Sequence, residues 1–176
     1  MKSRLSDISD LLENFSPILK QGAKSNFDVF DAIEPAVKMN WQRFKFHEIL
    51  FVGLEESEKH FRVKCPKHLL VSVISNLIDN AIYWLDVQKA KTGENGILTI
   101  TIDRENFAGP TLVITDNGPG FAIAPTELVP PFKTLKPDGM GVGLYFSSLV
   151  MDSIGGTLHF PKLEKGAAIA LTFPQI

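Results

Sequence analysis

The sequence predicts an α+β fold, a two-layer sandwich in which about three helices pack on a mixed, mostly antiparallel sheet. First, 44% of the 176 residues are hydrophobic and 22% are charged, as in a globular protein of one domain. Second, segments with helical and with strand periodicity are mixed along the chain. Third, consecutive strands are joined by short turns, which favours this class over a doubly wound parallel sheet.

Composition also excludes several classes of protein. Eighteen basic and twenty acidic residues give a net charge of −2, so we expect no nucleic-acid partner. The single cysteine, Cys65, cannot form an internal disulfide, which suits a reducing compartment. The sequence has neither an apolar run of ~20 residues nor an apolar signal core at its start. We therefore expect a cytoplasmic protein, tethered to the inner membrane only if domains upstream of Met1 provide an anchor.

Residues 1–25 predict an N-terminal helix that is distinct from the main domain at 26–176. Its apolar residues follow the steps of three and four that are typical of a coiled-coil seam: Leu5, Ile8, Leu12, Phe15 and Leu19. Two interpretations stay open at this point. The helix packs on the core of its own domain, or it is the tail of a dimerisation helix.

The elements of the main domain follow in order. Apolar spacing predicts a helix over 26–40, and β-branched and aromatic runs at 47–53 and 60–65 predict a hairpin. A long apolar pattern after Pro66 predicts a helix over 67–89. The second half is expected to contain strands at 97–103, 111–116, 156–160 and 167–173, an irregular segment at 117–140 and a helix at 141–153.

Glycine and proline gather in and around the irregular segment. Seven of the 13 glycines and five of the 11 prolines lie between positions 118 and 156. Asp116 ends a predicted strand and is followed by Gly118 and Gly120, so its carboxylate can point into a cleft while the backbone passes close to a flat ligand. Taken alone, these residues are explained more simply by an ordinary strand-ending turn.

A second glycine cluster directly precedes the last predicted helix. Gly139, Gly141 and Gly143 alternate along the chain, which leaves N–H groups open at a helix N-terminus and favours an anion site. Because no strand immediately precedes Gly139 and no Gly-Lys-Ser/Thr follows, the cluster is neither a dinucleotide fingerprint nor a Walker loop. Close packing is the alternative reason for such glycines.

Two asparagines interrupt the apolar pattern of the helix predicted over 67–89. Asn76 and Asn80 are four residues apart and therefore lie on one face. Because buried amides need hydrogen-bond partners, the pair indicates a shared polar ligand, with a structural pair that caps a neighbouring turn as the alternative. Asp79 lies one position off that face, so we expect it to be solvated or to support the site indirectly.

These segments together resemble a known family. NLIDNA at 76–81, DNGPG at 116–120 and FKTLKPDGMGVGL at 132–144 are similar to the N, G1, F and G2 boxes of the Bergerat-fold, or GHKL, ATPases. The resemblance covers about residues 26–174 and is strongest to the ATP-binding catalytic domain of bacterial sensor histidine kinases. It implies the Bergerat fold with an ATP lid, and ATP and Mg²⁺ as cofactors.

The resemblance also implies roles for single residues. Asn80 would hold Mg²⁺ through its side-chain oxygen, and Asp116 would accept a hydrogen bond from the adenine amine. Lys136 would contact the γ-phosphate, and Trp84 would stack near the base. The implied catalytic residues are Asn76, Asn80 and Lys136, and the implied nucleotide-binding residues are Asn76, Asn80, Trp84, Asp116, Gly118, Gly120, Phe132, Thr134, Lys136, Gly139, Met140, Gly141, Val142, Gly143 and Leu144.

Asn76 separates two kinds of chemistry within this family. Relatives that hydrolyse ATP carry a Glu at this position, whereas an amide cannot act as a general base. The sequence therefore favours transfer of the γ-phosphoryl group to a histidine on a dimerisation domain. Two departures from the family pattern are expected to affect nucleotide affinity: Tyr83 stands where a lysine is common, and Ala167 begins a segment in which many relatives carry a Thr.

The expected partners follow from the same resemblance. The one His-Glu pair, His47-Glu48, lies in a strand-like run and is expected to be unrelated to phosphorylation. The phosphoacceptor histidine would then lie on another domain or chain, with a response regulator downstream and a homodimer in a longer protein. The alternatives are a module that binds ATP only to regulate a partner, and a hydrolysing ATPase.

Overall fold

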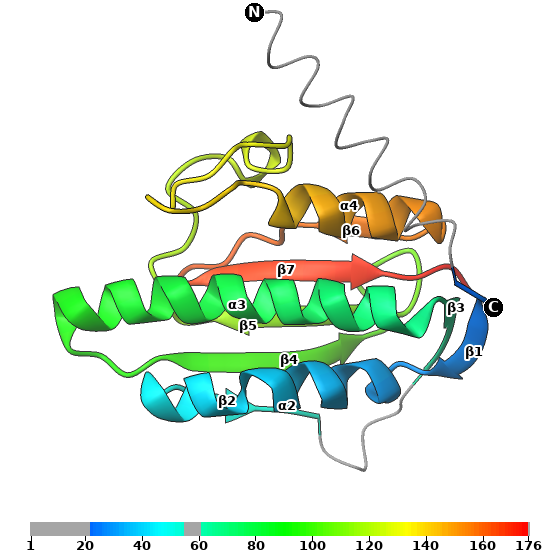
Figure 1. The fold of residues 1–176 in the computed structure, drawn as a ribbon, viewed down its shortest axis with the longest axis horizontal. Helices are drawn as coiled ribbons and strands as arrows, with labels where there is room; N and C mark the ends of the chain where they lie inside the picture. Colours follow the sequence, from blue (N-terminus) through cyan, green and yellow to red (C-terminus); the bar gives the residue numbers. More distant parts are fainter. Residues whose placement is uncertain (1–21, 55–60, 176) are drawn as a thin grey trace, which may run out of the picture.

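The fold is a two-layer sandwich of helices on one side and strands on the other (Figure 1). We describe it from a computed structural model that covers residues 22–54 and 61–175. Three helices cover one face of the main sheet: α2 (Phe30–Phe46), α3 (Lys67–Thr92) and α4 (Gly143–Ser153). The helix predicted within residues 1–25 lies outside the described residues, apart from the last few positions.

The main sheet has five strands in the order β2-β4-β5-β7-β6. Strand β2 (Leu50–Val52) runs parallel to β4 (Ile97–Asp103), and the other neighbours are antiparallel. These are β5 (Thr111–Asp116), β7 (Ala167–Thr172) and β6 (Thr157–His159). The predicted class, a mixed and mostly antiparallel sheet under three helices, is confirmed.

The first predicted helix was placed too early. Residues at its expected start form β1 (Ser25–Asp28), which pairs with β3 (Arg62–Cys65) in a separate two-stranded sheet. The Asp28 carboxylate accepts a hydrogen bond from Phe30 N at 2.9 Å, directly before α2 begins. The helix then continues to Phe46, because Phe44 is buried in the core on its inner face.

The predicted hairpin was wrong. Its two strands lie in different sheets, β2 beside β4 and β3 beside β1. Both runs have the strand composition that the pattern indicates, but their partners are distant in the sequence. Strand pairing depends on which edges the tertiary fold brings together, so the local pattern could not select them.

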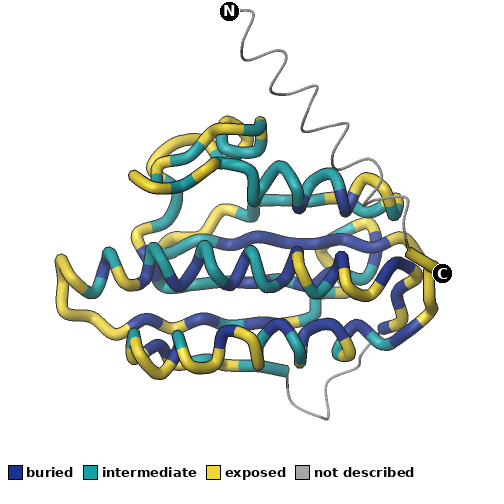
Figure 2. Tube along the Cα trace, viewed as in Figure 1, coloured by how far each residue is buried: buried dark blue, intermediate teal, exposed yellow. Residues whose placement is uncertain are grey.

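The core is built on α3, whose buried side is apolar from Leu69 to Leu85. The buried residues of this helix include Leu70, Val73, Ile74, Leu77, Ile78, Ile82 and Leu85. Figure 2 shows that β7 and one side of α3 are buried. The helix begins after Pro66 and ends at Gly93, whose φ of 75° is the left-handed conformation typical of a helix C-terminus. Within the described ranges, the helices lack the combination of length and apolarity that crossing a membrane requires.

Candidate nucleotide-binding site

A cavity of about 780 Å³ lies between α3, the start of α4 and the irregular segment that follows β5. The segment lies at the N-terminal end of α4 (Figure 1). Of the residues predicted to bind nucleotide, thirteen line the cavity: Asn76, Asn80, Trp84, Asp116, Gly120, Thr134, Lys136, Gly139, Met140, Gly141, Val142, Gly143 and Leu144. Gly118 and Phe132 do not line it, and Phe132 is an exposed side chain.

Asp116, the last residue of β5, lines the cavity beside Leu85 of α3, because a Cβ placed on Gly118 would lie 2.7 Å from Asp116 Oδ1 and 3.6 Å from Leu85 Cδ2. Its Oδ1 atom accepts hydrogen bonds from Gly118 N at 2.8 Å and from Ala167 N at 3.3 Å. Burial raises the pKa of this carboxyl, against the lowering effect of the two backbone donors. Within the described part of the chain Oδ2 accepts no hydrogen bond, so it is the acceptor that Asp116 offers to a ligand.

Gly166 holds the turn that packs on Asp116. It has a φ of +86°, and a Cβ placed on it would lie 1.7 Å from the Asp116 carbonyl oxygen. Gly120 packs against the same turn, since its Cβ would lie 2.9 Å from the Gly166 carbonyl oxygen. The two glycines therefore allow backbone to lie directly on backbone at this end of the cavity.

Gly166→Ala should lower the free energy of unfolding by roughly 2–5 kcal/mol, because it combines a left-handed backbone with overpacking. Gly155→Ala is the matched control, since Gly155 has a φ of +76° but no atom within 4 Å of an added Cβ. It should lose only the ~1–2 kcal/mol of the left-handed backbone. Urea unfolding of both variants measures the difference, and equal losses would contradict the contact with Asp116.

The other end of the cavity lies nine residues earlier on α3, or about 14 Å at 1.5 Å per residue, where Asn76 contacts Gly143, the first residue of α4. The Asn76 amide nitrogen donates to Ser147 Oγ at 3.1 Å, and Ser147 Oγ donates to the Gly143 carbonyl at 3.0 Å. Asn80 lines the cavity and makes no hydrogen bond within the described residues, so its amide oxygen is available to a ligand. Helix α4 begins at Gly143, two residues later than predicted, and Gly139 and Gly141 lie in the loop before it.

The donor set near Asn80 fits Mg²⁺ only together with a nucleotide. Asn80 supplies one neutral amide oxygen, and the described residues contain no group of three or more His, Cys, Asp or Glu that could hold a metal ion. Mg²⁺ usually keeps several waters and binds substrate phosphates together with one or two protein oxygens. A single amide oxygen suits that mode of binding.

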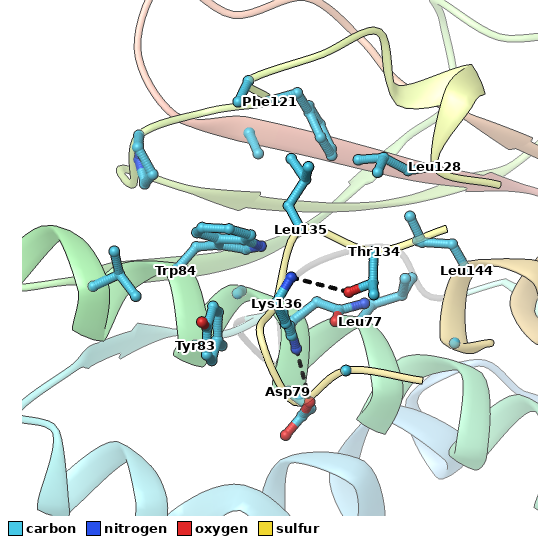
Figure 3. Close-up of a pocket in the computed structure, with 18 of the residues that line it drawn as sticks. Leu77, Asp79, Tyr83, Trp84, Phe121, Leu128, Thr134, Leu135, Lys136 and Leu144 are labelled. Carbon is cyan, nitrogen blue, oxygen red and sulfur yellow. Dashed lines mark hydrogen bonds and ion pairs between the residues drawn. The ribbon is translucent and has the colours of Figure 1, made fainter. Parts of the chain in front are cut away.

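Lys136 comes from the irregular segment and reaches back to α3 (Figure 3). Its Nζ atom lies 3.3 Å from Asp79 Oδ2 and 4.8 Å from the centre of the Tyr83 ring. Asp79 Oδ1 also binds Arg43 Nη1 of α2 at 2.5 Å. Asp79 therefore supports the site, because it forms an ion pair with Lys136, the one cation among the predicted catalytic residues.

The charges of this cluster shift the pKa values of its members. Burial lowers the pKa of Lys136, although Asp79 acts to raise it. Burial acts to raise the pKa of Asp79, but the hydrogen bond from Arg43 and the charges of Lys136 and Arg43 hold it below its usual value. Asp79 is therefore a carboxylate at neutral pH, and its Oδ2 atom lies 3.3 Å from Lys136 Nζ.

Apolar side chains form the remaining wall. Trp84 of α3 faces Phe121, Leu128 and Leu135 of the irregular segment across the cavity (Figure 3). A flat aromatic ligand fits between such side chains. The Thr134 hydroxyl accepts a hydrogen bond from Lys136 N at 3.0 Å, which orders the turn that carries the lysine.

Sequence reasoning missed three residues of this region. Ser147 is fully buried beside Asn76, Gln88 is buried and donates to the Asn117 carbonyl at 3.0 Å, and Arg43 holds Asp79. A polar residue within an apolar helix pattern was the available signal for Ser147 and Gln88. For Arg43 no local signal exists, because its partner is 36 residues away.

Comparisons with known proteins found a matching family, related sequences and similar structures. The family model described as histidine kinase-, DNA gyrase B-, and HSP90-like ATPase matches residues 66–176. The C4-dicarboxylate transport sensor protein DctB of Rhizobium meliloti (strain 1021) is 33% identical over 107 residues, which are 60% of this chain and 16% of that protein. The chain therefore spans a small part of the length of that relative.

Solved structures share the fold. The mycobacterial sensor histidine kinase MprB superposes with a TM-score of 0.68 at 24% identity, over 86% of this chain and 97% of that one. Histidine kinase ThkA, in complex with response regulator protein TrrA, gives a TM-score of 0.68 at 20% identity, over 99% of this chain and 49% of that one. With its motifs gathered around one cavity and its family match over residues 66–176, the chain belongs to the histidine kinase-, DNA gyrase B- and HSP90-like ATPase family.

Proposed function

We propose that this chain is the ATP-binding catalytic domain of a sensor histidine kinase, which transfers the γ-phosphoryl group of ATP to a histidine on a dimerisation domain. One observation carries the proposal. Residues from all the separate motifs line a single cavity, with the free carboxylate oxygen of Asp116 at one end and the N-terminus of α4 at the other. A nucleotide has the matching polarity, a base with an amine donor at one end and anionic phosphates at the other.

The cavity favours one direction of binding. The adenine amine would donate to Asp116 Oδ2, with the ring against Trp84. The phosphates would lie at the start of α4, where the helix dipole and open N–H groups favour anions. Asn80 Oδ1 would hold Mg²⁺, which neutralises charge on the phosphate oxygens when it is bound.

Asn76 favours phosphoryl transfer over hydrolysis. Its nitrogen donates to Ser147, and no part of an amide can take a proton from water at neutral pH. In the transfer, the bond from the γ-phosphorus to its bridging oxygen breaks as a bond to an imidazole nitrogen forms. ADP leaves with the electron pair, and the imidazole proton passes to solvent. The contribution of the chain is positioning and charge neutralisation, in which Lys136 faces the γ-phosphate.

The phosphoacceptor would come from another domain or chain. His47 ends α2 rather than lying in a strand, and its Nδ1 atom lies 2.8 Å from Asp86 Oδ1. Its neighbour Glu48 forms an ion pair with Lys89. Both residues of the His-Glu pair thus have partners on α3 away from the cavity. A response regulator, a homodimer in a longer protein and a cytoplasmic location belong to the same proposal.

The test uses labelled ATP and a separate histidine-bearing dimerisation domain. The proposed kinase binds Mg·ATP in calorimetry and transfers label to an acid-labile site on that domain, with little turnover when the domain is absent. Binding without transfer would favour the regulatory module, and turnover without an acceptor would favour a hydrolysing ATPase. No saturable binding of ATP or ADP would refute the nucleotide site itself.

Asn80→Ala should remove the dependence of ATP affinity on Mg²⁺. In the wild type, Mg²⁺ should tighten ATP binding by about tenfold or more, the usual effect of one good charged contact. In the variant, ATP should bind with and without Mg²⁺ about equally, and affinity in EDTA should match the wild type. Calorimetry with and without Mg²⁺ measures this.

The matched control is Asn95→Ala, an exposed loop asparagine outside the cavity. It should keep the full Mg²⁺ effect. Alanine favours helix, so Asn80→Ala should stay folded, as circular dichroism will report. A variant that retains the Mg²⁺ effect would show that Asn80 does not hold the metal.

A further inference from the structure

Ser147 is a polar side chain in the interior of the protein, and its environment sets it apart from the other serines of α4. It has no exposed surface, and it lies where α4 packs on α3. Its hydroxyl is bonded on both sides, to the Asn76 amide across the helix interface at 3.1 Å and to the Gly143 carbonyl of its own helix at 3.0 Å. A buried hydroxyl with two such partners does more than fill space, because it fixes the orientation of the groups to which it is hydrogen-bonded.

The polarity of these hydrogen bonds determines which way the Asn76 amide faces. A hydroxyl has a single proton, and here it goes to the Gly143 carbonyl. The remaining lone pairs of Ser147 can only accept, so Asn76 must present its nitrogen to them. The amide oxygen of Asn76 is then directed away from Ser147.

The contact with Gly143 shows where that amide lies. A Cβ placed on Gly143 would lie 2.4 Å from Asn76 Oδ1 and 3.0 Å from Asn76 Nδ2. The amide therefore packs against the first residue of α4, at the end of the helix that faces the cavity. Ser147 thus links the orientation of Asn76 to the position of the α4 N-terminus.

We propose that Ser147 is a positioning residue for nucleotide binding, which acts by holding the Asn76 amide with its oxygen toward the phosphate end of the cavity. The inference rests on the proposed function and deepens it. Ser147 itself does not line the cavity, so it acts only through Asn76 and Gly143. Without the hydroxyl, the amide of Asn76 is free to rotate and the Gly143 carbonyl loses its side-chain partner.

A double-mutant cycle tests whether Ser147 acts through Asn76. Ser147→Ala should weaken Mg·ATP binding by roughly fivefold to tenfold, the effect of one net hydrogen bond. In an Asn76→Ala background the same substitution should change affinity by less than about twofold, because the residue that it positions is already absent. Calorimetry with Mg·ATP gives all four dissociation constants.

Two further variants control for packing. Ser147→Cys fills the site with a slightly larger thiol that is only a weak donor and acceptor, so it should lose affinity although it leaves no cavity. Ser153→Ala removes a hydroxyl that bonds a carbonyl of the same helix, Val150 O at 2.7 Å, without contact to Asn76. It should leave affinity unchanged. Equal losses from Ser147→Ala in both backgrounds would overturn the proposal and indicate packing alone.

A nucleotide-free measurement separates this proposal from the proposed function. The side-chain amide signals of Asn76 in a ¹⁵N–¹H spectrum, assigned by their loss in Asn76→Ala, should shift in Ser147→Ala and stay in Ser153→Ala. Unshifted signals would overturn the positioning role even if ATP binds. If the signals shift in Ser147→Ala as expected but the wild type binds no nucleotide, the proposed function is refuted and the positioning of Asn76 is not.

Discussion

Asp116→Asn should weaken ATP binding about 10- to 100-fold, because it replaces the free carboxylate oxygen at the end of β5. The amide oxygen can still accept from Gly118 N and Ala167 N, as Oδ1 does now. The amide nitrogen then takes the place of Oδ2 and opposes the adenine amine, donor against donor. The loss should be specific to bases that present a donor.

The measurement compares ATP and GTP in calorimetry. The wild type should prefer ATP, and in Asp116→Asn the two affinities should approach each other. Asp103→Asn is the control, since Asp103 also accepts backbone hydrogen bonds, from Glu105 N and Asn106 N at 2.9 Å, but lies outside the cavity. An Asp116→Asn protein that still prefers ATP would show that another group distinguishes adenine from guanine.

The same carboxyl should make binding and stability respond to pH in opposite directions. Since burial raises the pKa of Asp116, ATP binding should weaken as the pH falls through that raised value and the acceptor is protonated. Because the pKa of Asp116 is higher in the folded protein than in the unfolded chain, the protonated carboxyl stabilises the fold at a pH below the unfolded-state pKa. This stabilisation is lost as the pH rises through the folded-state pKa. Asp116→Asn should therefore be neutral or stabilising at pH 7 in urea unfolding. A clear destabilisation there would contradict the effect of burial.

Lys136→Met should lower the rate of phosphoryl transfer by about 100-fold, the effect of removing one group that stabilises charge in a transition state. The lysine is preorganised for this, because Asp79 and the Tyr83 ring hold it at the cavity. The methionine side chain is one atom shorter and unbranched like that of lysine, but it has no charge. ATP affinity should fall much less than the rate, since Lys136 is needed most where charge develops on the γ-phosphate.

Single-turnover transfer to the histidine-bearing domain gives the rate, and calorimetry gives the affinity. Lys162→Met, an exposed lysine outside the cavity, should change neither. If Lys136→Met lowers affinity as much as it lowers the rate, the lysine contributes to ground-state binding instead. A variant with the wild-type rate would remove Lys136 from the catalytic residues.

Much of the fold follows from local pattern. The limits of β4 and β5 agree with the predicted strands, and α3 differs from its prediction only at its C-terminal end. These elements could be predicted because strand alternation and helical apolar spacing are patterns among neighbouring residues. The hairpin failed for the opposite reason. Residues 50–52 and 62–65 have strand composition, but they pair with β4 and β1 and not with each other. These strand edges come together only when the whole chain folds.

The sequence by itself determined the family and thirteen of the residues that line the cavity, because the motifs carry their chemistry in short strings such as 76–81 and 116–120. The tertiary structure alone decided how those residues are held. Lys136 meets Asp79 across 57 positions, and Asn76 meets Ser147 across 71. Contacts between residues this far apart produce no periodic pattern in the sequence. They depend on how α3, α4 and the intervening segment pack, and packing is decided by the whole fold.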